Sequence, residues 1–145
     1  MPVTRQMLRL VLVENDPDDL FFLTRALTKE GFTHPLLHFR DGLEALNYFT
    51  TLEAPGAVLP HIVLTDLKMP RVDGMDLLQW LRSRPAFKDF PVIILTSSSE
   101  ASDMRQTARL GIFKFVTKEV RYENVISTLN LFLISLNAEA GRSSR

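Results

Sequence analysis

Cysteine is absent from the 145-residue chain, and neither sign of charge is in excess, because 17 acidic residues balance 17 basic ones. The absence of cysteine excludes a disulfide framework, a thiolate nucleophile and a thiolate metal site. The balanced charge gives no indication of nucleic-acid binding or of attachment to an anionic membrane.

Long apolar runs are also missing. No segment approaches the ~20 apolar residues that a membrane-spanning helix needs. The N-terminal apolar run, residues 8–13, is short and ends at Glu14, so we expect no signal peptide. The expected protein is therefore cytoplasmic and binds neither nucleic acid nor membrane.

Five short apolar segments alternate along the chain with segments of helical periodicity. The strands are expected at residues 8–14, 35–39, 61–66, 90–97 and 113–117. The middle strands are nearly continuous apolar runs, which is typical of parallel strands covered on both faces. Strict alternation predicts an α/β fold of the flavodoxin-like type. Its five-stranded parallel sheet would have the order 2-1-3-4-5, with helices on both faces.

The whole chain, residues 1–145, is expected to form a single domain. Its core would span about residues 8–138, with a frayed tail over residues 139–145. Asp16 is placed to cap the first helix, Pro17 to open it and Gly31 to end it.

Polar side chains follow four of the expected strands at the points where those strands end. Asn15 and Asp16 follow the first strand, Asp66 ends the third, Thr96 ends the fourth and Lys118 follows the fifth. Taken singly, each has an ordinary explanation as a helix cap, a loop residue or a surface lysine. In the order 2-1-3-4-5, however, strands 1, 3, 4 and 5 are neighbours, so these side chains would converge at one rim. The convergence indicates a site.

The residue types at this rim suit phosphoryl transfer. Carboxylate and amide oxygens suit Mg²⁺, a lysine suits a phosphoryl oxygen, and a threonine hydroxyl can donate to another oxygen of that group. An aspartate beside a metal can act as the nucleophile and form an acyl phosphate, so Asp66 is the predicted acceptor. Glu14 is expected to point to the other side of the sheet by strand alternation, and it is not counted in the site.

The segments LVENDPDD, DGLEAL, LTDLKMPRVDG, VIILTSS and GIFKFVTK resemble the receiver domain of two-component response regulators. The resemblance covers about residues 8–136. It is strongest to the single-domain regulators that pair with phytochrome-type histidine kinases. It implies that Asp66 accepts a phosphoryl group from a sensor histidine kinase. The chain would then signal through a conformational switch to a downstream target or a phosphotransfer protein. Apart from its own phosphotransfer and slow autodephosphorylation, it would not be an enzyme.

The resemblance also implies a metal site for Mg²⁺, or Mn²⁺ in its place. Asp16, Asp66 and the main-chain carbonyl of Lys68 would bind the metal, and Asn15 would contact it through water. The side chain of Lys68 would tune hydrolysis of the acyl phosphate.

The remaining implied roles concern the bound phosphoryl group. Lys118 would pair with it, Thr96 would move toward it, and Phe115 would follow the threonine inward. Ser98 and Glu119 would tune its lifetime.

Two positions depart from the family pattern. Asn15 removes one negative charge from the expected metal site, which should weaken Mg²⁺ binding. Glu119 stands where the family has a proline joined to the preceding lysine by a cis bond. Before a non-proline residue a cis bond costs ~2.5–4 kcal/mol, so the Lys118–Glu119 bond is either strained or trans. Both departures motivate an alternative function, a pseudo-receiver binding module with impaired phosphorylation.

The last helix, expected over residues 122–138, is apolar nearly all round. A helix that covers one sheet face needs only an apolar stripe, so a second partner is expected. We predict a homodimer through a surface that comprises Leu129, Phe132, Leu133 and Leu136. The alternative is a C-terminal tail that folds back over the helix.

Overall fold

The computed structural model describes residues 2–33, 36–97 and 100–143. Its five parallel strands form one sheet in the order β2-β1-β3-β4-β5, which confirms the predicted flavodoxin-like topology. The strands are β1 (Leu10–Val13), β2 (Leu36–Phe39), β3 (Ile62–Asp66), β4 (Val92–Thr96) and β5 (Lys114–Thr117). They alternate with the helices α1 (Pro17–Lys29), α2 (Gly42–Thr51), α3 (Gly74–Ser83), α4 (Ala101–Leu110) and α5 (Glu123–Ser143).

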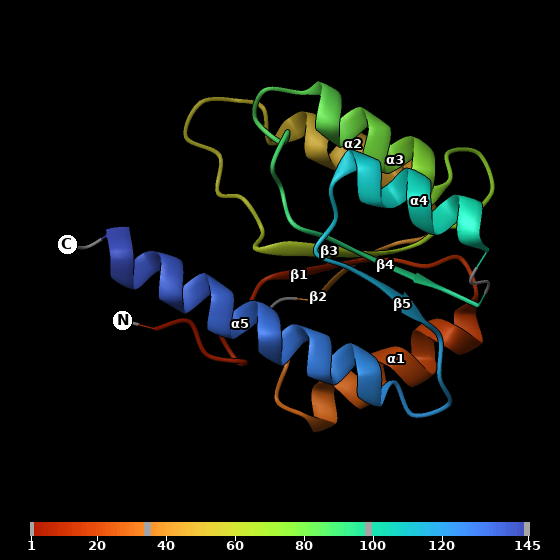
Figure 1. Cartoon of the computed structure of the whole chain (residues 1–145), viewed down its shortest axis with the longest axis horizontal. Coiled ribbons are helices and arrows are strands. Elements are labelled where there is room, and N and C mark those ends of the chain that lie inside the picture. Colours follow the sequence, from red (N-terminus) through yellow and green to blue (C-terminus); the bar gives the residue numbers. More distant parts are fainter. Residues whose placement is uncertain (1, 34–35, 98–99, 144–145) are drawn as a thin grey trace.

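Helices cover both faces of the sheet, as Figure 1 shows, with α1 and α5 on one face and α2, α3 and α4 on the other. Successive strand residues point to opposite faces, so each strand supplies side chains to two separate apolar cores. Leu12 and Leu64 belong to the core under α1 and α5, whereas Val13 and Val63 belong to the other core. This double coverage explains why the strands read as continuous apolar runs.

The first helix begins as the sequence predicts. The Oδ1 atom of Asp16 accepts hydrogen bonds from the main-chain N–H groups of Asp18 and Asp19, at 2.9 and 3.1 Å. Pro17 is the first helical residue, where its missing N–H costs nothing. Beyond the C-terminus, Gly31 adopts φ 87°, a conformation that favours glycine. The cap places Asp19 on the first turn of α1, next to the carboxyl ends of the strands.

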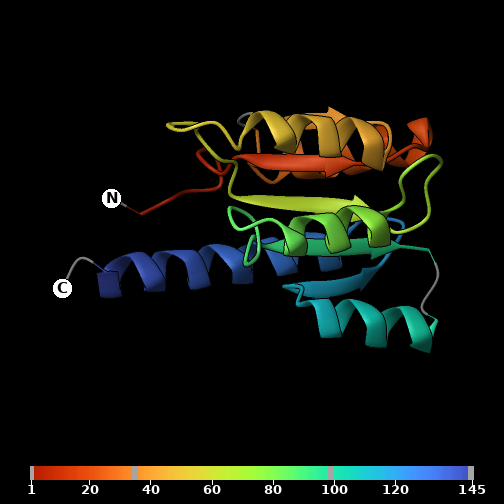
Figure 2. The same ribbon diagram turned by 90° about the horizontal axis from the view of Figure 1, so that it is seen from above.

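The last helix is longer than predicted. It continues to Ser143, so the expectation of a frayed tail from residue 139 onward is wrong for residues 139–143, while residues 144–145 lie outside the described part. Ala138, Glu139 and Ala140 are strong helix formers, and a helix that is already nucleated extends through such residues without tertiary packing. Figures 1 and 2 both show the C-terminal part of α5 reaching well beyond the sheet.

The residues predicted to form a dimer surface lie instead against the chain's own sheet. Leu129, Phe132 and Leu133 are buried in the core under α1 and α5, and Leu136 packs against the same core. The prediction of this surface is therefore wrong. Most of the apolar width of α5 is used to cover strands and α1, and a count of apolar residues around a helix does not show how far its own domain wraps it. Within the described residues, no helix is both long and apolar enough to cross a bilayer.

Gly74 brings α3 close to the end of β3. It is the first residue of α3 and is buried, and its main-chain N–H donates to the carbonyl oxygen of Leu67 at 2.9 Å. A Cβ atom at this position would overlap the main-chain carbonyl of Asp66. Only glycine therefore allows α3 to pack this closely against the strand end.

We predict that Gly74→Ala lowers the free energy of unfolding by about 1–3 kcal/mol, the usual cost of overpacking a buried site. The measurement is chemical denaturation of the parent and the variant. Gly141→Ala is the matched control, because a Cβ at that helical position meets nothing within 4 Å. The control should raise the free energy of unfolding by up to ~1 kcal/mol through helix propensity. Equal effects of the two substitutions would contradict the packing argument.

Candidate functional site

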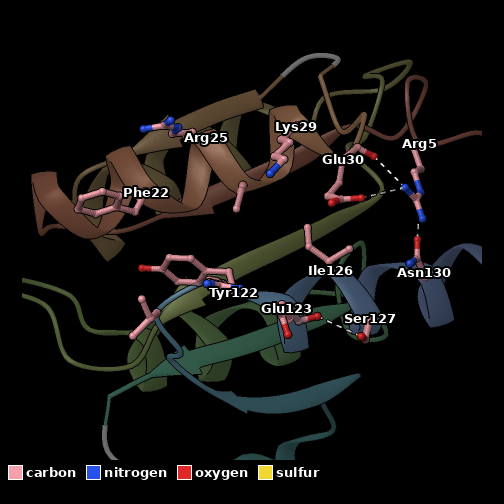
Figure 3. Close-up of a pocket in the computed structure, with 13 residues that line it drawn as sticks. Arg5, Phe22, Arg25, Lys29, Glu30, Tyr122, Glu123, Ile126, Ser127 and Asn130 are labelled. Atoms are coloured by element: carbon pink, nitrogen blue, oxygen red, sulfur yellow. Dashed lines mark hydrogen bonds and ion pairs between the residues drawn. The ribbon is translucent and has the colours of Figure 1, made fainter.

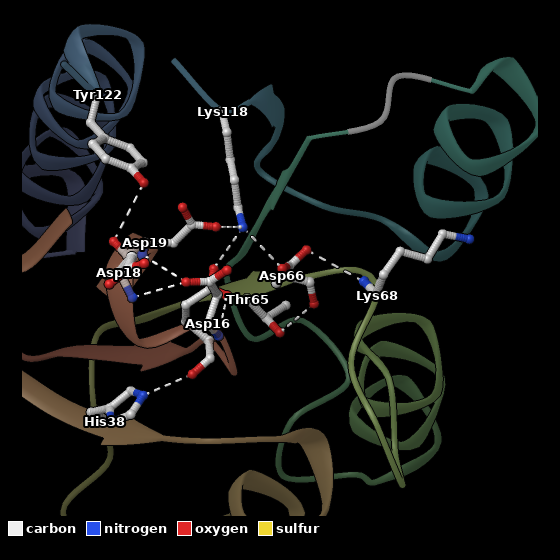
Figure 4. A network of polar contacts seen from close by, with 10 residues as sticks. Asp16, Asp18, Asp19, His38, Thr65, Asp66, Lys68, Lys118 and Tyr122 are labelled. Atoms are coloured by element: carbon white, nitrogen blue, oxygen red, sulfur yellow. Dashed lines mark hydrogen bonds and ion pairs between the residues drawn. The ribbon is translucent and has the colours of Figure 1, made fainter. Parts of the chain in front are cut away.

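Asp66 is the last residue of β3 and is nearly buried, with 8% of its surface exposed. It pairs with Leu95 of β4 in the sheet register. The hydroxyl of Thr65 donates to the main-chain carbonyl of Asp66 at 2.9 Å, and the main-chain N–H of Lys68 lies 3.4 Å from its Oδ1 atom. One carboxylate oxygen, Oδ2, faces the end of β5, where Lys118 lies (Figure 4).

The ammonium group of Lys118 is the centre of the cluster. Its Nζ atom lies 2.7 Å from Oδ2 of Asp19, 2.9 Å from Oε2 of Glu14 and 3.1 Å from Oδ2 of Asp66. The main-chain N–H of Lys118 donates to the carbonyl of Thr96 at 2.8 Å, which ties the β5 end to β4. The bond from Lys118 to the next residue is trans, since the described residues contain no cis peptide bond.

The environment shifts the pKa of two groups in this cluster. Burial alone would lower the pKa of the Lys118 ammonium, but hydrogen bonds to Asp19 and Glu14 and the charge of Asp66 raise it above its ordinary value. Burial raises the pKa of the Glu14 carboxyl, and the charge of Asp66 adds to the rise. Hydrogen bonds from the Asp16 N–H and from Lys118 offset only part of it. At neutral pH, Lys118 is therefore fully charged.

The expected orientation of Glu14 is wrong. The structure places it on the same side of the sheet as Asp66, buried and in contact with the same ammonium group. The register explains why. Val13 pairs with Thr65, so the residues that follow them, Glu14 and Asp66, lie side by side and point to the same face of the sheet. The sequence alone did not reveal this, because alternation within one strand does not fix its register against the neighbouring strand.

Asp16 and Asn15 lie at the same rim, but both are exposed. The Oδ1 atom of Asp16 is engaged in capping α1. Among the described residues, no group of three or more carboxylate or imidazole side chains is arranged to hold a metal ion. Glu14 and Asp66, which share one ammonium group, still form a pair of oxygen donors. Such a pair fits Mg²⁺, which commonly binds through one or two carboxylates and keeps several waters.

The other predicted residues surround this centre at different depths. Thr96 is buried at the end of β4, beside β3. Phe115 is half-buried on β5 and packs into the core on the α2–α4 side. Lys68 is exposed, and its ammonium lies 3.7 Å from Oδ2 of Asp103 on α4. Glu119 is exposed. Ser98 lies outside the described residues.

Asp19 has no role in the sequence-based prediction, yet it makes the shortest contact with Lys118. Its position on the first turn of α1, three residues after the cap Asp16, was a usable signal. The first turn of a helix that follows β1 in this fold lies beside the strand ends.

A hollow lies away from this cluster, between α1 and α5 (Figure 3). Its volume is about 870 Å³, and Phe22, Lys29 and Tyr122 are among the residues that line it. Neither Asp66 nor Lys118 reaches it. The polar cluster at the strand ends lies outside this hollow, and about a tenth of the Asp66 side chain is exposed at the rim.

Comparison with known proteins identifies related chains. The family described as response regulator receiver domain matches residues 10–130. The probable methanogenesis regulatory protein FilR2 of Methanothrix harundinacea is 31% identical over 120 residues, which is 83% of this chain and 77% of FilR2.

Two response regulators with solved structures are also similar. The bacteriophytochrome response regulator AtBRR is 36% identical, with a TM-score of 0.71, and the match covers 85% of this chain and 91% of AtBRR. Response regulator Rcp1 of Synechocystis is 29% identical over 110 residues, 75% of each protein. A solved structure of the Mn²⁺-bound form of a response regulator named Rcp1 matches with a TM-score of 0.67 at 25% identity, over 86% of this chain and 89% of that one.

We predict that Glu14→Gln raises the free energy of unfolding at pH 7. The buried carboxylate repels Asp66, and its raised pKa means that its charged form disfavours the folded state. Protonation of Glu14 therefore stabilises the fold. The advantage of the variant should shrink as the pH falls through this raised pKa, because the parent is then neutral at the same position.

Thermal denaturation between pH 4 and pH 8 measures this difference. Glu119→Gln is the control, since it removes the same charge from an exposed position beside Lys118. A variant at position 14 that is less stable than the parent at pH 7 would mean that Lys118 requires all three carboxylates.

Proposed function

The chain belongs to the response regulator receiver-domain family, and from this we propose that Asp66 accepts a phosphoryl group from a phosphohistidine of a sensor histidine kinase. The observation that carries the proposal is the position of the Asp66 carboxylate. It stands at the end of β3 on the open rim, with the Lys118 ammonium 3.1 Å from its Oδ2 atom.

The proposed transfer moves one phosphoryl group. A carboxylate oxygen of Asp66 attacks the phosphorus in line with the phosphorus–nitrogen bond of the phosphohistidine, and that bond breaks. The imidazole leaves with the bonding electrons, and an acyl phosphate remains on Asp66. Lys118 holds a phosphoryl oxygen by charge. Thr96, at the end of the neighbouring strand, donates a hydrogen bond from its hydroxyl to another phosphoryl oxygen. Phe115 follows Thr96 when the domain switches.

A divalent ion belongs to this proposal. The carboxylates of Glu14 and Asp66 and the main-chain carbonyl of Lys68 would hold the ion, and Asp16 and Asn15 would contact it through water. When bound, Mg²⁺ or Mn²⁺ neutralises charge on the transferred group. The donor chemistry supports this assignment, as does the Mn²⁺-bound form of the similar protein Rcp1. Lys68, Ser98 and Glu119 are proposed to tune hydrolysis of the acyl phosphate, as the family resemblance implies.

The proposed upstream partner is a phytochrome-type histidine kinase, because AtBRR is a bacteriophytochrome response regulator. The downstream partner is a target protein or a phosphotransfer protein that recognises the phosphorylated conformation. Activation then shifts an equilibrium between two states that exist before phosphorylation.

A second candidate function is a binding module that is not phosphorylated. Two observations favour it. Asn15 supplies no charge at the rim. The ammonium group of Lys118 already contacts three carboxylates, which leaves it no free N–H for a phosphoryl oxygen. Such a module would bind its partner in one state only.

We also propose a homodimer, through an α5 surface different from the one that the sequence predicted. Leu131 and Ile134 are 55% and 66% exposed, and their spacing of three residues puts them on one face of α5. Two large apolar side chains on one face of a long helix favour a second copy of that helix as the partner.

We predict that incubation with acetyl phosphate and Mg²⁺ adds one phosphoryl group, about 80 Da from its formula, to the parent and none to Asp66→Asn. Intact-mass spectrometry is the measurement, and Asp18→Asn, an exposed acid on the same rim, is the control that should behave as the parent. Addition to Asp66→Asn would place the acceptor elsewhere. If neither acetyl phosphate nor a phosphorylated kinase modifies the parent, the binding-module function is correct.

For the homodimer, we predict that light scattering at micromolar concentration gives twice the monomer mass for the parent. Leu131→Ser combined with Ile134→Ser should give the monomer mass with an unchanged circular dichroism spectrum, because only exposed apolar surface is removed. Val58→Ser, at an exposed loop position, should leave the dimer intact. A monomeric parent would contradict the homodimer.

A further inference from the structure

The ammonium group of Lys118 has no donor to spare. A lysine ammonium carries three N–H donors, and three carboxylates, those of Glu14, Asp19 and Asp66, lie within 3.1 Å of Nζ. Only 13% of the lysine side chain is exposed, so water has little access to it. A phosphoryl oxygen that approaches Lys118 must therefore replace one of these three partners.

The three carboxylates are not equally replaceable. The side chains of Glu14 and Asp66 are 3% and 10% exposed, whereas that of Asp19 is 37% exposed. A buried carboxylate that loses its cation becomes an unpaired buried charge, which costs far more than the same loss at a solvated position. Asp19 can turn to water, and Glu14 cannot. Asp66 is itself the proposed acceptor and stays beside the group that it receives.

The position of Asp19 supports this distinction. Asp19 stands on the first turn of α1, held by its main-chain N–H bond to Asp16, and Asp66 ends β3 (Figure 4). Glu14 directly follows β1. In the part of the chain that the structure describes, the Asp19 carboxylate contacts no cation other than Lys118. Its bond to Lys118, 2.7 Å, is the shortest of the three. Asp19 therefore makes a short contact with Lys118, but its partly exposed carboxylate can be solvated by water when that contact is lost.

We propose that Asp19 is a positioning residue of the acceptor site, which holds Lys118 before phosphorylation and gives it up to the arriving phosphoryl group. The proposal rests on the phospho-acceptor function proposed above for Asp66. No covalent bond changes in this step, because one oxygen partner of the ammonium is exchanged for another. Asp19 thus slows the uptake of phosphate by competing for the lysine.

The first test compares the rate of phosphorylation by acetyl phosphate and Mg²⁺ in the parent, Asp19→Asn and Asp18→Asn. Asp19→Asn should be phosphorylated about two- to fivefold faster, the effect of removing a partly exposed ion pair. Asp18→Asn removes the same charge from the neighbouring residue, whose carboxylate does not reach Lys118, and should stay close to the parent rate. An unchanged or slower Asp19→Asn, or an equal acceleration in Asp18→Asn, would overturn the proposal.

The second test follows the lysine itself and needs no phosphorylation. In protein with ¹⁵N-labelled lysine, the Lys118 ammonium signal is assigned by its loss in Lys118→Arg, and its hydrogen exchange with water is measured. Exchange should be faster in Asp19→Asn than in the parent, because Asp19 accepts from one of the three N–H groups of the ammonium. It should be unchanged in Asp18→Asn, because the Asp18 carboxylate does not contact the ammonium. Equal exchange in all three proteins would overturn the proposal.

Together the two tests separate this inference from the proposed function. If the parent takes up no phosphate but the ammonium signal responds to Asp19→Asn alone, the acceptor function fails and the contact of Asp19 with Lys118 stands. If the parent is phosphorylated and neither readout responds to Asp19→Asn, the function stands and the role of Asp19 fails.

Discussion

One ammonium group, that of Lys118, holds together carboxylates that reach it from three different elements. Glu14 comes from the end of β1, Asp19 from α1 and Asp66 from the end of β3. Without this cation, buried negative charges would face one another at the sheet edge, at a cost that the apolar cores would have to offset. The same arrangement keeps Asp66 beside a positive charge at an open rim. The Lys118 ammonium thus stabilises the strand ends and also provides a positive charge that can bind an anionic group.

The sheet determines which side chains can take part in this cluster. Parallel strands end at one edge, and the β1–β3 register pairs Val13 with Thr65, so that Glu14 and Asp66 become neighbours. The bond from the Lys118 N–H to the Thr96 carbonyl fixes the lysine's backbone against β4. Gly74 lets α3 approach the end of β3 from the other face. No single element forms the site. The site forms because the strand ends and the first turn of α1 meet at one edge of the sheet.

Much of this arrangement could be predicted from patterns in the chain. Continuous apolar runs indicated buried parallel strands, and the cap at Asp16 with Pro17 located the start of α1. Strand order then predicted that Asp66 and Lys118 would meet. The prediction failed for Glu14, because alternation within one strand does not show which of its residues point to the same face as those of the neighbouring strand. It also failed for Leu129 and Phe132, because apolar positions around a helix do not reveal how much of it the domain itself covers.

The sequence by itself determined the elements, their order in the sheet and the residue types at the rim, because periodicity and end signals act over a few residues of chain. Only the tertiary structure decided that Glu14 and Asp19 are further partners of Lys118. Asp19 and Lys118 are separated by 99 positions in the chain, and their contact depends on the packing of α1 beside the end of β5. Local patterns place Asp19 on the first turn of α1, near the strand ends, but they do not specify its contact with Lys118. The exposed or buried state of each carboxylate, which distinguishes Asp19 from Glu14, likewise arises only when the helices cover the sheet.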